Sequence, residues 1–357
     1  MGSPAHVQCY WVKGRQLNVP TLAQRYQRGL VAELELALQG RIVPLYDMLR
    51  YHLGWIDEHG EPVEGMGGKG IRPNLCLLAC AAVGGRAEAA LPAAAAIELV
   101  HNFSLIHDDI EDESLQRRHR PTVWSIWGVP QAVNAGDSMY TLARLVLYRL
   151  EEHQVSERKI MRVAKALDEA CIKLCEGQYL DLFFQHKTDV TIAEYIDMIG
   201  LKTGALIGTT LFVGATIGAN RTKVASSLYS IGAGLGLAFQ IWDDILGIWG
   251  VSSQMGKAVG EDIINKKKSL PIIYLWEHSD EPKKDALRNI YSKDVITNED
   301  VELIMAMLDR IEARPFSEHL AERYFDEAMV SLDRLPLFNP AADELKSLCA
   351  TVVQRNF

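Results

Sequence analysis

The sequence predicts an all-α protein. Apolar residues recur at helical spacing along nearly the whole chain, whereas alternating apolar and polar runs typical of strands are scarce. Neither Asn-Gly nor Asp-Gly, the strongest hairpin signals, occurs in the sequence. Proline and glycine cluster between the helical runs rather than at one central linker. We therefore expect one helical domain, residues 21–357, of roughly ten or more helices, after a flexible segment at residues 1–20.

The individual helices are delimited by their own start and stop signals. Residues 22–53 are typical of one or two amphipathic helices with a charged face. A loop rich in glycine, proline and charge follows at residues 52–70, and Pro73 and Pro92 suit the first turns of the next two helices. Further helices are predicted at residues 131–153, 156–184, 192–217 and 224–249, with three or four shorter pieces after Pro271.

The composition excludes several classes of protein. Of the 357 residues 48% are hydrophobic and 23% charged, which supports a sizeable core and excludes general disorder. The 46 acidic residues outnumber the 37 Lys and Arg, which disfavours nucleic acid as a partner. No uninterrupted apolar run reaches the length of a transmembrane segment, and no signal peptide is recognisable. The six cysteines do not form a disulfide pattern, so a cytoplasmic protein is expected.

Two acidic clusters follow apolar helical runs, where a helix least favours them. Asp108 and Asp112 lie four residues apart on one helical face, with Asp109 beside them. Asp243 and Asp244 end a second apolar run. Carboxylates repel each other at this spacing and are disfavoured near a helix C-terminus, so something must compensate their charge. Clusters of carboxylate oxygens suit Mg²⁺, and we predict a magnesium site.

Basic residues gather beside both acidic clusters, although the net charge is −9. Arginine binds phosphate through its planar fork and lysine as a mobile point charge. The pattern therefore predicts a polyanion bound together with metal, and ordinary surface lysines are expected only at Lys266 and Lys268. The remaining basic residues of the pattern are Lys69, Arg72, Arg117, Arg118, Lys202, Lys257 and Lys267.

Two familiar phosphate-binding motifs are absent. The run GGKG is not a Walker loop, because Val63 stands in place of its first glycine and Gly70 in place of its Ser or Thr. The glycines at residues 232–236 are not a dinucleotide fingerprint, because Leu237 replaces the final glycine and no strand precedes them. These glycines instead indicate a close approach of a helix or a ligand.

The motifs together resemble the trans-polyprenyl diphosphate synthase family, which has the isoprenoid synthase fold. The likeness extends from Gly67 to about Pro271, through GGKGIRP, ELVHNFSLIHDDIED, RRHRPT, NAGD, KTG, FQIWDD, GKAVGED and KKSLP. It implies a helical bundle around a deep central cavity, usually a homodimer. It also implies a prenyltransferase that joins isopentenyl diphosphate head to tail to an allylic diphosphate, with three magnesium ions between the two aspartate clusters.

The resemblance implies a role for each matching residue. Asp108, Asp112 and Asp243 resemble the metal ligands, with Asp109 and Asp244 in support. Isopentenyl diphosphate would be bound by Lys69, Arg72, His101 and Arg118, and the allylic diphosphate by Arg117, Lys257 and Lys267. Lys202, Thr203 and Gln240 would flank the reacting carbons and the leaving group.

These residue types fit the implied reaction. Ionising a carbon–oxygen bond produces a carbocation and a diphosphate anion, and fixed cations and metal ions stabilise the negative charge that develops. Dry apolar walls would protect the carbocation from water. No dedicated base is evident, and in the family the departing diphosphate is thought to take the proton.

The second aspartate motif departs from the family pattern. The family usually has Asp-Asp-x-x-Asp there, but in this chain Gly247 occupies the place of the third aspartate. Glu261 and Asp262 follow later in the sequence, at positions that the sequence alone does not locate in space. Retained activity is the favoured interpretation, because the first motif, both arginines and KKSLP are intact.

Product length is predicted from helical geometry. Phe103 and Ser104 precede Asp108 by five and four residues, which places them roughly 6–7.5 Å deeper along the helix. A phenyl ring there would close the tunnel for the growing chain, while Ser104 leaves room beside it. A short product, geranylgeranyl or farnesyl diphosphate, is therefore expected.

Two alternatives share some of these features. A class I terpene cyclase has the same fold and magnesium chemistry but needs no isopentenyl diphosphate site, so Lys69, Arg72, His101 and Arg118 speak against it. A non-catalytic regulatory subunit of a synthase is supported only by Gly247. Turnover by the isolated protein discriminates between these functions.

Overall fold

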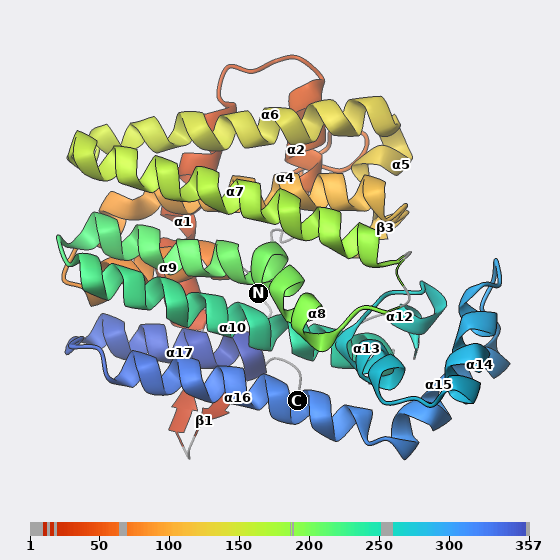
Figure 1. The fold of residues 1–357 in the computed structure, drawn as a ribbon. Coiled ribbons are helices and arrows are strands. Elements are labelled where there is room, and N and C mark those ends of the chain that lie inside the picture. The colour runs from red at the N-terminus through yellow and green to blue at the C-terminus, as the bar shows by residue number, and fades with distance from the viewer. Residues whose placement is uncertain are drawn as a thin grey trace, which may run out of the picture. The chain divides into compact units, whose positions relative to one another are not determined.

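A computed structural model describes residues 10–12, 15–17, 20–63, 70–185, 187, 189–250 and 260–354, and these are mostly helical (Figure 1). The predicted all-α class is confirmed. The described strands are short and form two antiparallel hairpins, one pairing β1 (Tyr10–Val12) with β2 (Arg15–Leu17) and the other pairing β3 (Gln116–Arg117) with β4 (Arg120–Pro121). The first hairpin falls within the segment predicted to be flexible.

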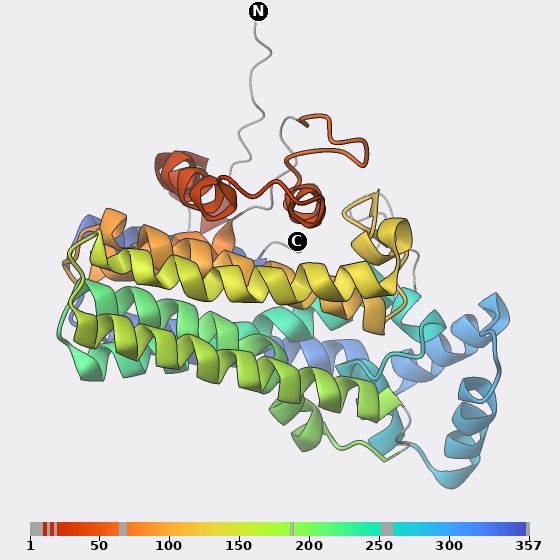
Figure 2. The same cartoon turned by 90° about the horizontal axis from the view of Figure 1, so that it is seen from above.

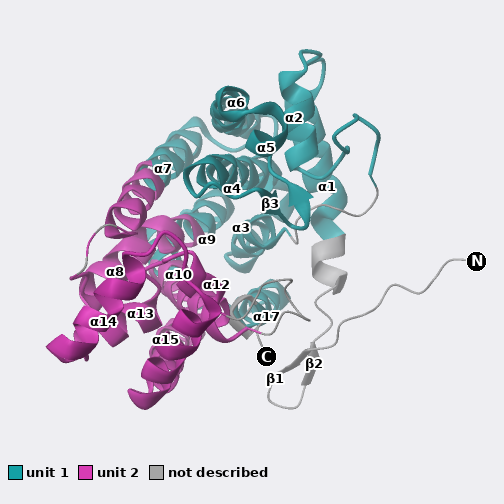
Figure 3. Ribbon diagram, turned by 90° about the vertical axis from the view of Figure 1, so that its right-hand side faces the viewer, with its two compact units in different colours: residues 1–171, 209–229, 335–351 teal, residues 172–208, 230–334, 352–357 magenta. Residues whose placement is uncertain are grey.

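The chain separates into two compact units, shown in Figure 3. Unit 1 comprises residues 1–171, 209–229 and 335–351, and unit 2 comprises residues 172–208, 230–334 and 352–357. The division falls inside α7 (Glu157–Gln185), α9 (Ala205–Gly218) and α10 (Thr222–Trp249), which therefore supply residues to both units. The single domain and the central cavity expected from the sequence stay predictions.

Unit 1 is built on two long helices, α4 (Leu91–Glu111) and α6 (Val129–Tyr148), which pack side by side. Alanines 93–96 of α4 are completely buried, and their small side chains allow this close packing. Helices α1 (Pro20–Leu38) and α2 (Leu45–His52) lie over this pair (Figure 2). The remaining elements of unit 1 are α3 (Ile71–Ala82), η1 (Ala87–Ala90), α5 (Val123–Trp127), η2 (Arg149–Glu151) and most of α17 (Pro340–Gln354).

Glycines of α9 let this helix approach α3 within unit 1. A Cβ atom at Gly214 would lie 2.0 Å from the carbonyl oxygen of Cys76, and one at Gly218 would lie 2.4 Å from that of Cys80. Both contacts are far closer than a real Cβ allows. Cys76 and Cys80 are completely buried, so they are the small core residues that their spacing predicts.

The helical run that the sequence predicts as continuous from residue 192 to 217 begins in unit 2 and ends in unit 1. The structure instead interrupts it with a π-helical turn, η3 (Gly200–Gly204), between α8 (Ile192–Ile199) and α9. Helix α8 begins with a capping box in which Thr191 and Glu194 each accept a hydrogen bond from the other's backbone N–H. The π turn carries Lys202 and Thr203, and such turns are frequent at functional sites.

A second apolar core fills the later part of unit 2. Its central side chains include Ile248, Leu275, Leu287 and Ile304, all completely buried. The elements of this part are α12 (Glu261–Ile264), α13 (Leu270–Glu277), α14 (Glu281–Tyr291), α15 (Asn298–Arg310) and α16 (Ala313–Asp333), with the end of α17 at residues 352–354. In the described part of the chain four helices, α14 to α17, begin after Pro271, in agreement with the three or four that the sequence predicts.

Three stretches of helix are long and apolar enough, by length and composition alone, to cross a membrane. They are residues 87–111, 192–218 and 222–249, and 72%, 72% and 44% of their apolar windows are buried within the protein. The sequence criterion was an uninterrupted apolar run, and these stretches do not meet it because polar residues interrupt them. Packing inside a helical protein accounts for their apolar character, so they are not evidence of a membrane span.

Candidate active site

The first acidic cluster lies at the C-terminal end of α4, and its members have different surroundings. Asp109 is 1% exposed, and its Oδ1 accepts a hydrogen bond of 2.8 Å from Nε of Arg117. Burial raises the pKa of Asp109 to about 6, against the opposing effect of Arg117. Asp108 is partly buried and Asp112 is exposed, and the N–H of Asp112 donates to the carbonyl oxygen of Asp108. The helix therefore turns Asp109 inward and leaves Asp108 and Asp112 one turn apart.

A tight hairpin presents the two predicted arginines. Arg117 ends β3, while Arg118 and His119 form the two-residue turn with φ angles of 53° and 62°. Positive φ at both positions is typical of a type I′ turn, which usually contains glycine or asparagine. Arg120 fixes the hairpin to the end of α2, because its guanidinium donates to the carbonyl oxygen of Tyr51 at 3.1 Å and stacks 3.9 Å from the centre of that ring.

Around Arg118 of this hairpin, unit 1 contains a cluster of basic side chains, in which Arg72 and His101 are partly buried and Arg118 is exposed. Burial lowers the pKa of Arg72, with Glu98 opposing. Burial, followed by Arg72 and Arg118, holds the pKa of His101 well below its ordinary range. The Nε–H of Arg72 is buried with no hydrogen-bond acceptor among the described residues. An unpaired donor and a neutral histidine beside arginines are suited to receive an anion.

Two further residues at this cluster were not predicted from the sequence. His52, at the end of α2, has its pKa lowered to about 3 by burial and then by Arg118. Glu98 has its pKa raised by burial, although Arg72 opposes the shift. Asn102 donates to the carbonyl oxygen of Glu98 at 2.8 Å. Glu98 and Asn102 precede Asp109 by whole numbers of helical turns, and this spacing could have indicated that they share its helix face. No sequence feature near His52 indicated that it belongs to this cluster.

Phe103 and Ser104 lie on α4 as expected. Phe103 is 8% exposed, and its ring meets those of His107 and Tyr140 edge to face, with centroids 5.9 and 5.2 Å apart. The hydroxyl of Ser104 donates to the carbonyl oxygen of His101 at 2.8 Å. Tyr140 belongs to α6, so the neighbouring helix supports the predicted floor, a contribution that the spacing along α4 does not reveal.

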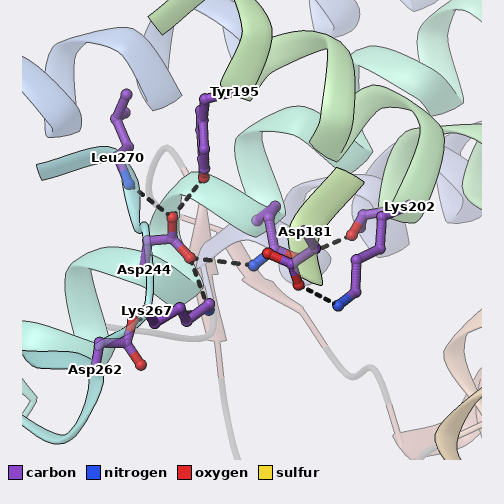
Figure 4. A network of polar contacts seen from close by, with 9 residues as sticks. Asp181, Tyr195, Lys202, Asp244, Asp262, Lys267 and Leu270 are labelled. Atoms are coloured by element: carbon purple, nitrogen blue, oxygen red, sulfur yellow. Dashed lines mark hydrogen bonds and ion pairs between the residues drawn. The ribbon is translucent and has the colours of Figure 1, made fainter. Parts of the chain in front are cut away.

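In unit 2, Asp244 is the centre of a network of hydrogen bonds (Figure 4). It is 1% exposed, and its Oδ2 accepts from the hydroxyl of Tyr195 at 2.5 Å and from the N–H of Leu270 at 2.9 Å. Its Oδ1 accepts from Nε2 of Gln240 at 3.2 Å and from Nζ of Lys267 at 3.1 Å. Four donors within the protein thus share the charge of Asp244.

Asp243 is partly buried and lacks this set of donors, which distinguishes the two aspartates of the second motif. Burial alone lowers the pKa of Lys267, but Asp244, Asp262 and Asp243 together raise it well above its ordinary value. Lys267 is therefore protonated at neutral pH. Metal binding by Asp243 or Asp244 stays a prediction.

The π turn brings the other predicted residues of unit 2 into this network. Nζ of Lys202 lies 2.5 Å from Oδ2 of Asp181, a residue of α7. Oγ1 of Thr203 donates to Oε1 of Gln240 at 2.8 Å, and Gln240 in turn donates to Asp244. The predicted grouping of Lys202, Thr203 and Gln240 is thus realised in one unit.

Asp181 and Tyr195 were missed by sequence reasoning. A signal was available for Asp181, because GQYLD places a glycine and an acid one helical turn apart. The glycine is Gly177, where a Cβ would lie 2.4 Å from the backbone nitrogen of Lys202. Tyr195 resembles an ordinary core aromatic in sequence.

Two of the predicted lysines, Lys69 and Lys257, lie outside the described residues. Lys268 differs from the prediction of an ordinary surface lysine. It is 5% exposed, and its ammonium lies 5.1 and 4.9 Å from the ring centres of Trp276 and Tyr291. Burial lowers its pKa to about 8. Sequence reasoning failed here because a run of lysines carries no information on which one turns inward.

The described residues were also compared with the requirements of a metal ion. No group of three or more His, Cys, Asp or Glu side chains in this part of the chain forms a cage for a metal. Magnesium does not require one, because it keeps several waters and binds through one or two carboxylates together with phosphate oxygens. Asp108 and Asp112, one turn apart beside a cluster of basic side chains, are suited to such binding.

Comparison with known proteins decides the family. The polyprenyl synthetase family model matches residues 54–308. The chain belongs to the polyprenyl synthetase family. Among curated relatives of this polyprenyl synthetase, the (2E,6E)-farnesyl diphosphate synthase of Mycobacterium tuberculosis is 35% identical over 311 residues, covering 86% of this chain and 85% of that protein. The geranylgeranyl diphosphate synthase of the same organism is 36% identical over 306 residues, with the same coverage.

Solved structures agree with this assignment. A polyprenyl synthetase from Streptomyces coelicolor superposes with a TM-score of 0.86 at 34% identity, covering 94% of this chain and 99% of that one. A geranylgeranyl pyrophosphate synthetase from Pyrococcus horikoshii gives 0.83 at 35% identity, with the same coverage. These comparisons confirm the predicted family, its all-α isoprenoid synthase fold and its class as a prenyltransferase. They also favour a short-chain prenyl diphosphate synthase over a cyclase or a regulatory subunit.

Proposed function

We propose that this polyprenyl synthetase condenses isopentenyl diphosphate with an allylic diphosphate, head to tail, to form farnesyl or geranylgeranyl diphosphate. The observation that carries the proposal is the combination of two features on α4. His101 belongs to the cluster of basic side chains with Arg72 and Arg118, and Asp108 and Asp112 form the carboxylate pair roughly 10 Å further along the same helix. A synthase needs both an anion pocket and a metal-binding pair, whereas a cyclase needs only the second.

The resemblance to the family assigns a task in the reaction to each matching residue. Bound Mg²⁺ would supply positive charge that stabilises the departing diphosphate. Arg117 and Lys267 would bind the allylic diphosphate, and Arg72, His101 and Arg118 would orient isopentenyl diphosphate. The allylic C–O bond breaks with its electron pair leaving on diphosphate, the double bond of isopentenyl diphosphate attacks the cation, and a proton then passes to the departed diphosphate.

Thr203 and Gln240 would direct their dipoles toward the carbocation. Their mutual hydrogen bond and the bond from Gln240 to Asp244 hold both side chains in fixed orientations. Fixed dipoles require no reorganisation when charge develops, which is the main advantage of a protein site over water.

Three magnesium ions, a homodimer and a cytoplasmic location complete the proposal. The carboxylates of α4 and α10 support the metal ions by their chemistry. Exposed apolar side chains on α6, such as Leu145 at 48% and Tyr148 at 61% exposure, support a second copy of the chain as the partner. The excess of acidic residues supports the expectation that nucleic acid is not a partner.

The test is an incubation of the full chain with Mg²⁺, isopentenyl diphosphate and, separately, dimethylallyl, geranyl and farnesyl diphosphate. Products resolved by chain length should end at farnesyl or geranylgeranyl diphosphate, and EDTA should abolish their formation. Release of a hydrocarbon from an allylic diphosphate alone would indicate a cyclase. Binding of diphosphate without any turnover would indicate a regulatory subunit.

A further inference from the structure

The glycine that interrupts the second aspartate motif has a steric cause. A Cβ atom at Gly247 would lie 2.3 Å from Oδ2, 2.4 Å from Cγ and 2.6 Å from Oδ1 of Asp262. All three distances are shorter than real Cβ contacts. Gly247 lies inside α10, where glycine is less favourable than alanine, so backbone conformation is no reason for it. The carboxylate of Asp262 fills the space that a side chain at position 247 would enter.

Asp262 is joined to the Asp244 network through Lys267. Its Oδ2 lies 3.7 Å from Nζ of Lys267, and the same ammonium lies 3.1 Å from Oδ1 of Asp244 (Figure 4). The N–H of Lys267 also donates to the carbonyl oxygen of Asp262 at 2.9 Å. The backbone and the carboxylate of Asp262 therefore both fix Lys267.

The turn after α12 makes this double contact possible. Lys266 adopts φ 54°, the left-handed conformation that ends a helix and reverses the chain. The reversal brings Lys267 back over α12, and Asp262 is 6% exposed there. An ammonium held between two buried carboxylates has a defined position, whereas a lysine side chain in solvent samples many rotamers.

We propose that Asp262 supplies from α12 the carboxylate that position 247 lacks, and that it acts as a positioning residue for Lys267. The departure from Asp-Asp-x-x-Asp is then a relocation of one carboxylate, and Gly247 leaves the space that this carboxylate occupies. The inference rests on the proposed function only in assigning the allylic diphosphate to Lys267. Its steric part is independent of any activity.

The steric part is tested by thermal unfolding of the full chain in four forms: wild type, Gly247→Ala, Asp262→Gly and the double variant. Gly247→Ala should lower the melting temperature in the wild-type background. In the Asp262→Gly background the same substitution should raise it, because the space is free and alanine favours the helix. The same sign in both backgrounds would overturn the proposal.

Gly234→Ala is the matched control on the same helix. A Cβ there would meet Ala328 at 3.6 Å and Tyr324 at 3.7 Å, which are ordinary contacts. This substitution should leave the melting temperature equal or higher in both backgrounds. A fall as large as that of Gly247→Ala would show a general intolerance of α10 and would overturn the steric explanation.

The positioning part is tested by the kinetics of Asp262→Asn, which keeps the volume and removes the charge. KM for the allylic diphosphate should rise about tenfold, equivalent to about 1.4 kcal/mol. KM for isopentenyl diphosphate should change by less than about twofold, because Lys267 is not among its proposed ligands. If Asp262 only competed with substrate for Lys267, the substitution would lower the allylic KM. A lower or unchanged value would overturn the proposal.

A swap completes the test. Gly247→Asp combined with Asp262→Gly returns a carboxylate to the motif and should recover most of the allylic affinity lost in Asp262→Gly alone. Calorimetry with inorganic diphosphate and Mg²⁺ provides a reading that does not depend on turnover: the swap should bind more tightly than Asp262→Gly. Equal binding would overturn the relocation, and a wild type that binds diphosphate without elongating a chain would instead contradict the proposed function.

Discussion

At the residue scale, the same residue type performs different tasks according to its surroundings. Asp109 and Asp244 lie inside the protein and accept hydrogen bonds from Arg117 and from four donors respectively. Their neighbours Asp108 and Asp243 are partly buried instead. In each motif the buried aspartate thus holds a basic side chain, Arg117 or Lys267. The family resemblance separates the expected metal ligands from their supporting neighbours, and the structure adds that Asp109 and Asp244, the supporting neighbours, are the buried members.

Phe103 offers a prediction about product length. Replacement by alanine removes a ring that packs against His107 and Tyr140, and the resulting space should admit a longer chain. Phe103→Ala should therefore shift the products of the incubation by at least one isoprene unit. Ser104→Ala, which removes only a hydroxyl bonded to the backbone, serves as the control and should leave the products unchanged. An unaltered distribution in Phe103→Ala would disprove the floor.

Lys268 offers a prediction about pH. Its pKa is about 8 in the folded protein against an ordinary value of 10.5. The unfolded chain therefore binds the proton more tightly, so stability rises as pH rises from about 8 to 10.5, and the destabilisation is complete below about 8. Lys268→Met should raise the free energy of unfolding at pH 7 by about 2–3 kcal/mol.

The measurement is denaturant unfolding of wild type and Lys268→Met at pH 7 and pH 10. The difference between the two proteins should shrink at the higher pH, because the wild-type lysine is then neutral in the fold. The exposed Lys223 provides the control, and Lys223→Met should differ little from wild type at either pH. A difference for Lys268→Met that does not depend on pH would contradict the assigned pKa.

At the scale of elements, turns and interruptions of helices decide where the functional side chains lie. The type I′ turn presents Arg118, and the π turn of residues 200–204 directs Lys202 toward Asp181. Neither element was predicted, because the first lacks the usual glycine or asparagine and the second has the apolar periodicity of an ordinary helix. The periodicity of apolar residues predicts helices well. It does not reveal the one extra residue in a turn that makes the turn π-helical.

The contact between α7 and the π turn offers a prediction. A Cβ at Gly177 would meet backbone atoms of Lys202 at 2.4 and 2.7 Å, and backbone cannot move aside as a flexible side chain can. Gly177→Ala should therefore lower the free energy of unfolding by about 1–3 kcal/mol. It should also reduce kcat by displacing Lys202 and Thr203.

Gly200→Ala is the control within the π turn itself. Its Cβ would meet only a methyl group of Leu237 at 3.8 Å, an ordinary contact. Chemical unfolding and steady-state kinetics of both variants make the comparison. If Gly177→Ala is as stable and as active as Gly200→Ala, the close approach of α7 to the π turn is not needed for function.

At the scale of the whole molecule, the proposed homodimer is the property to test. A glutamate pair, Leu145→Glu with Tyr148→Glu, places two charges among exposed apolar side chains of α6 and should yield a monomer by analytical ultracentrifugation. Val295→Glu alters another exposed apolar residue, at 74% exposure in unit 2, and should leave the dimer intact. A wild-type protein that sediments as a monomer would rule out the dimer.

The sequence by itself determined the all-α class, most helix positions and the family. These properties follow from local periodicity and from motifs whose residues are neighbours along a helix, such as Asp108 and Asp112. In the structure Arg72 acts on the pKa of His101, and Thr203 and Gln240 are joined by a hydrogen bond, while the roles of these residues stay predictions.

Only the tertiary structure decided how the individual side chains are used. It placed His52 beside the arginines, Tyr140 behind Phe103, Lys268 between two aromatic rings and Asp262 against Gly247. Each of these contacts joins residues of different elements, and its energy depends on burial and distance in three dimensions. Residue type and spacing show which polar and charged side chains the chain contains. Packing determines which of these side chains are desolvated and which are paired.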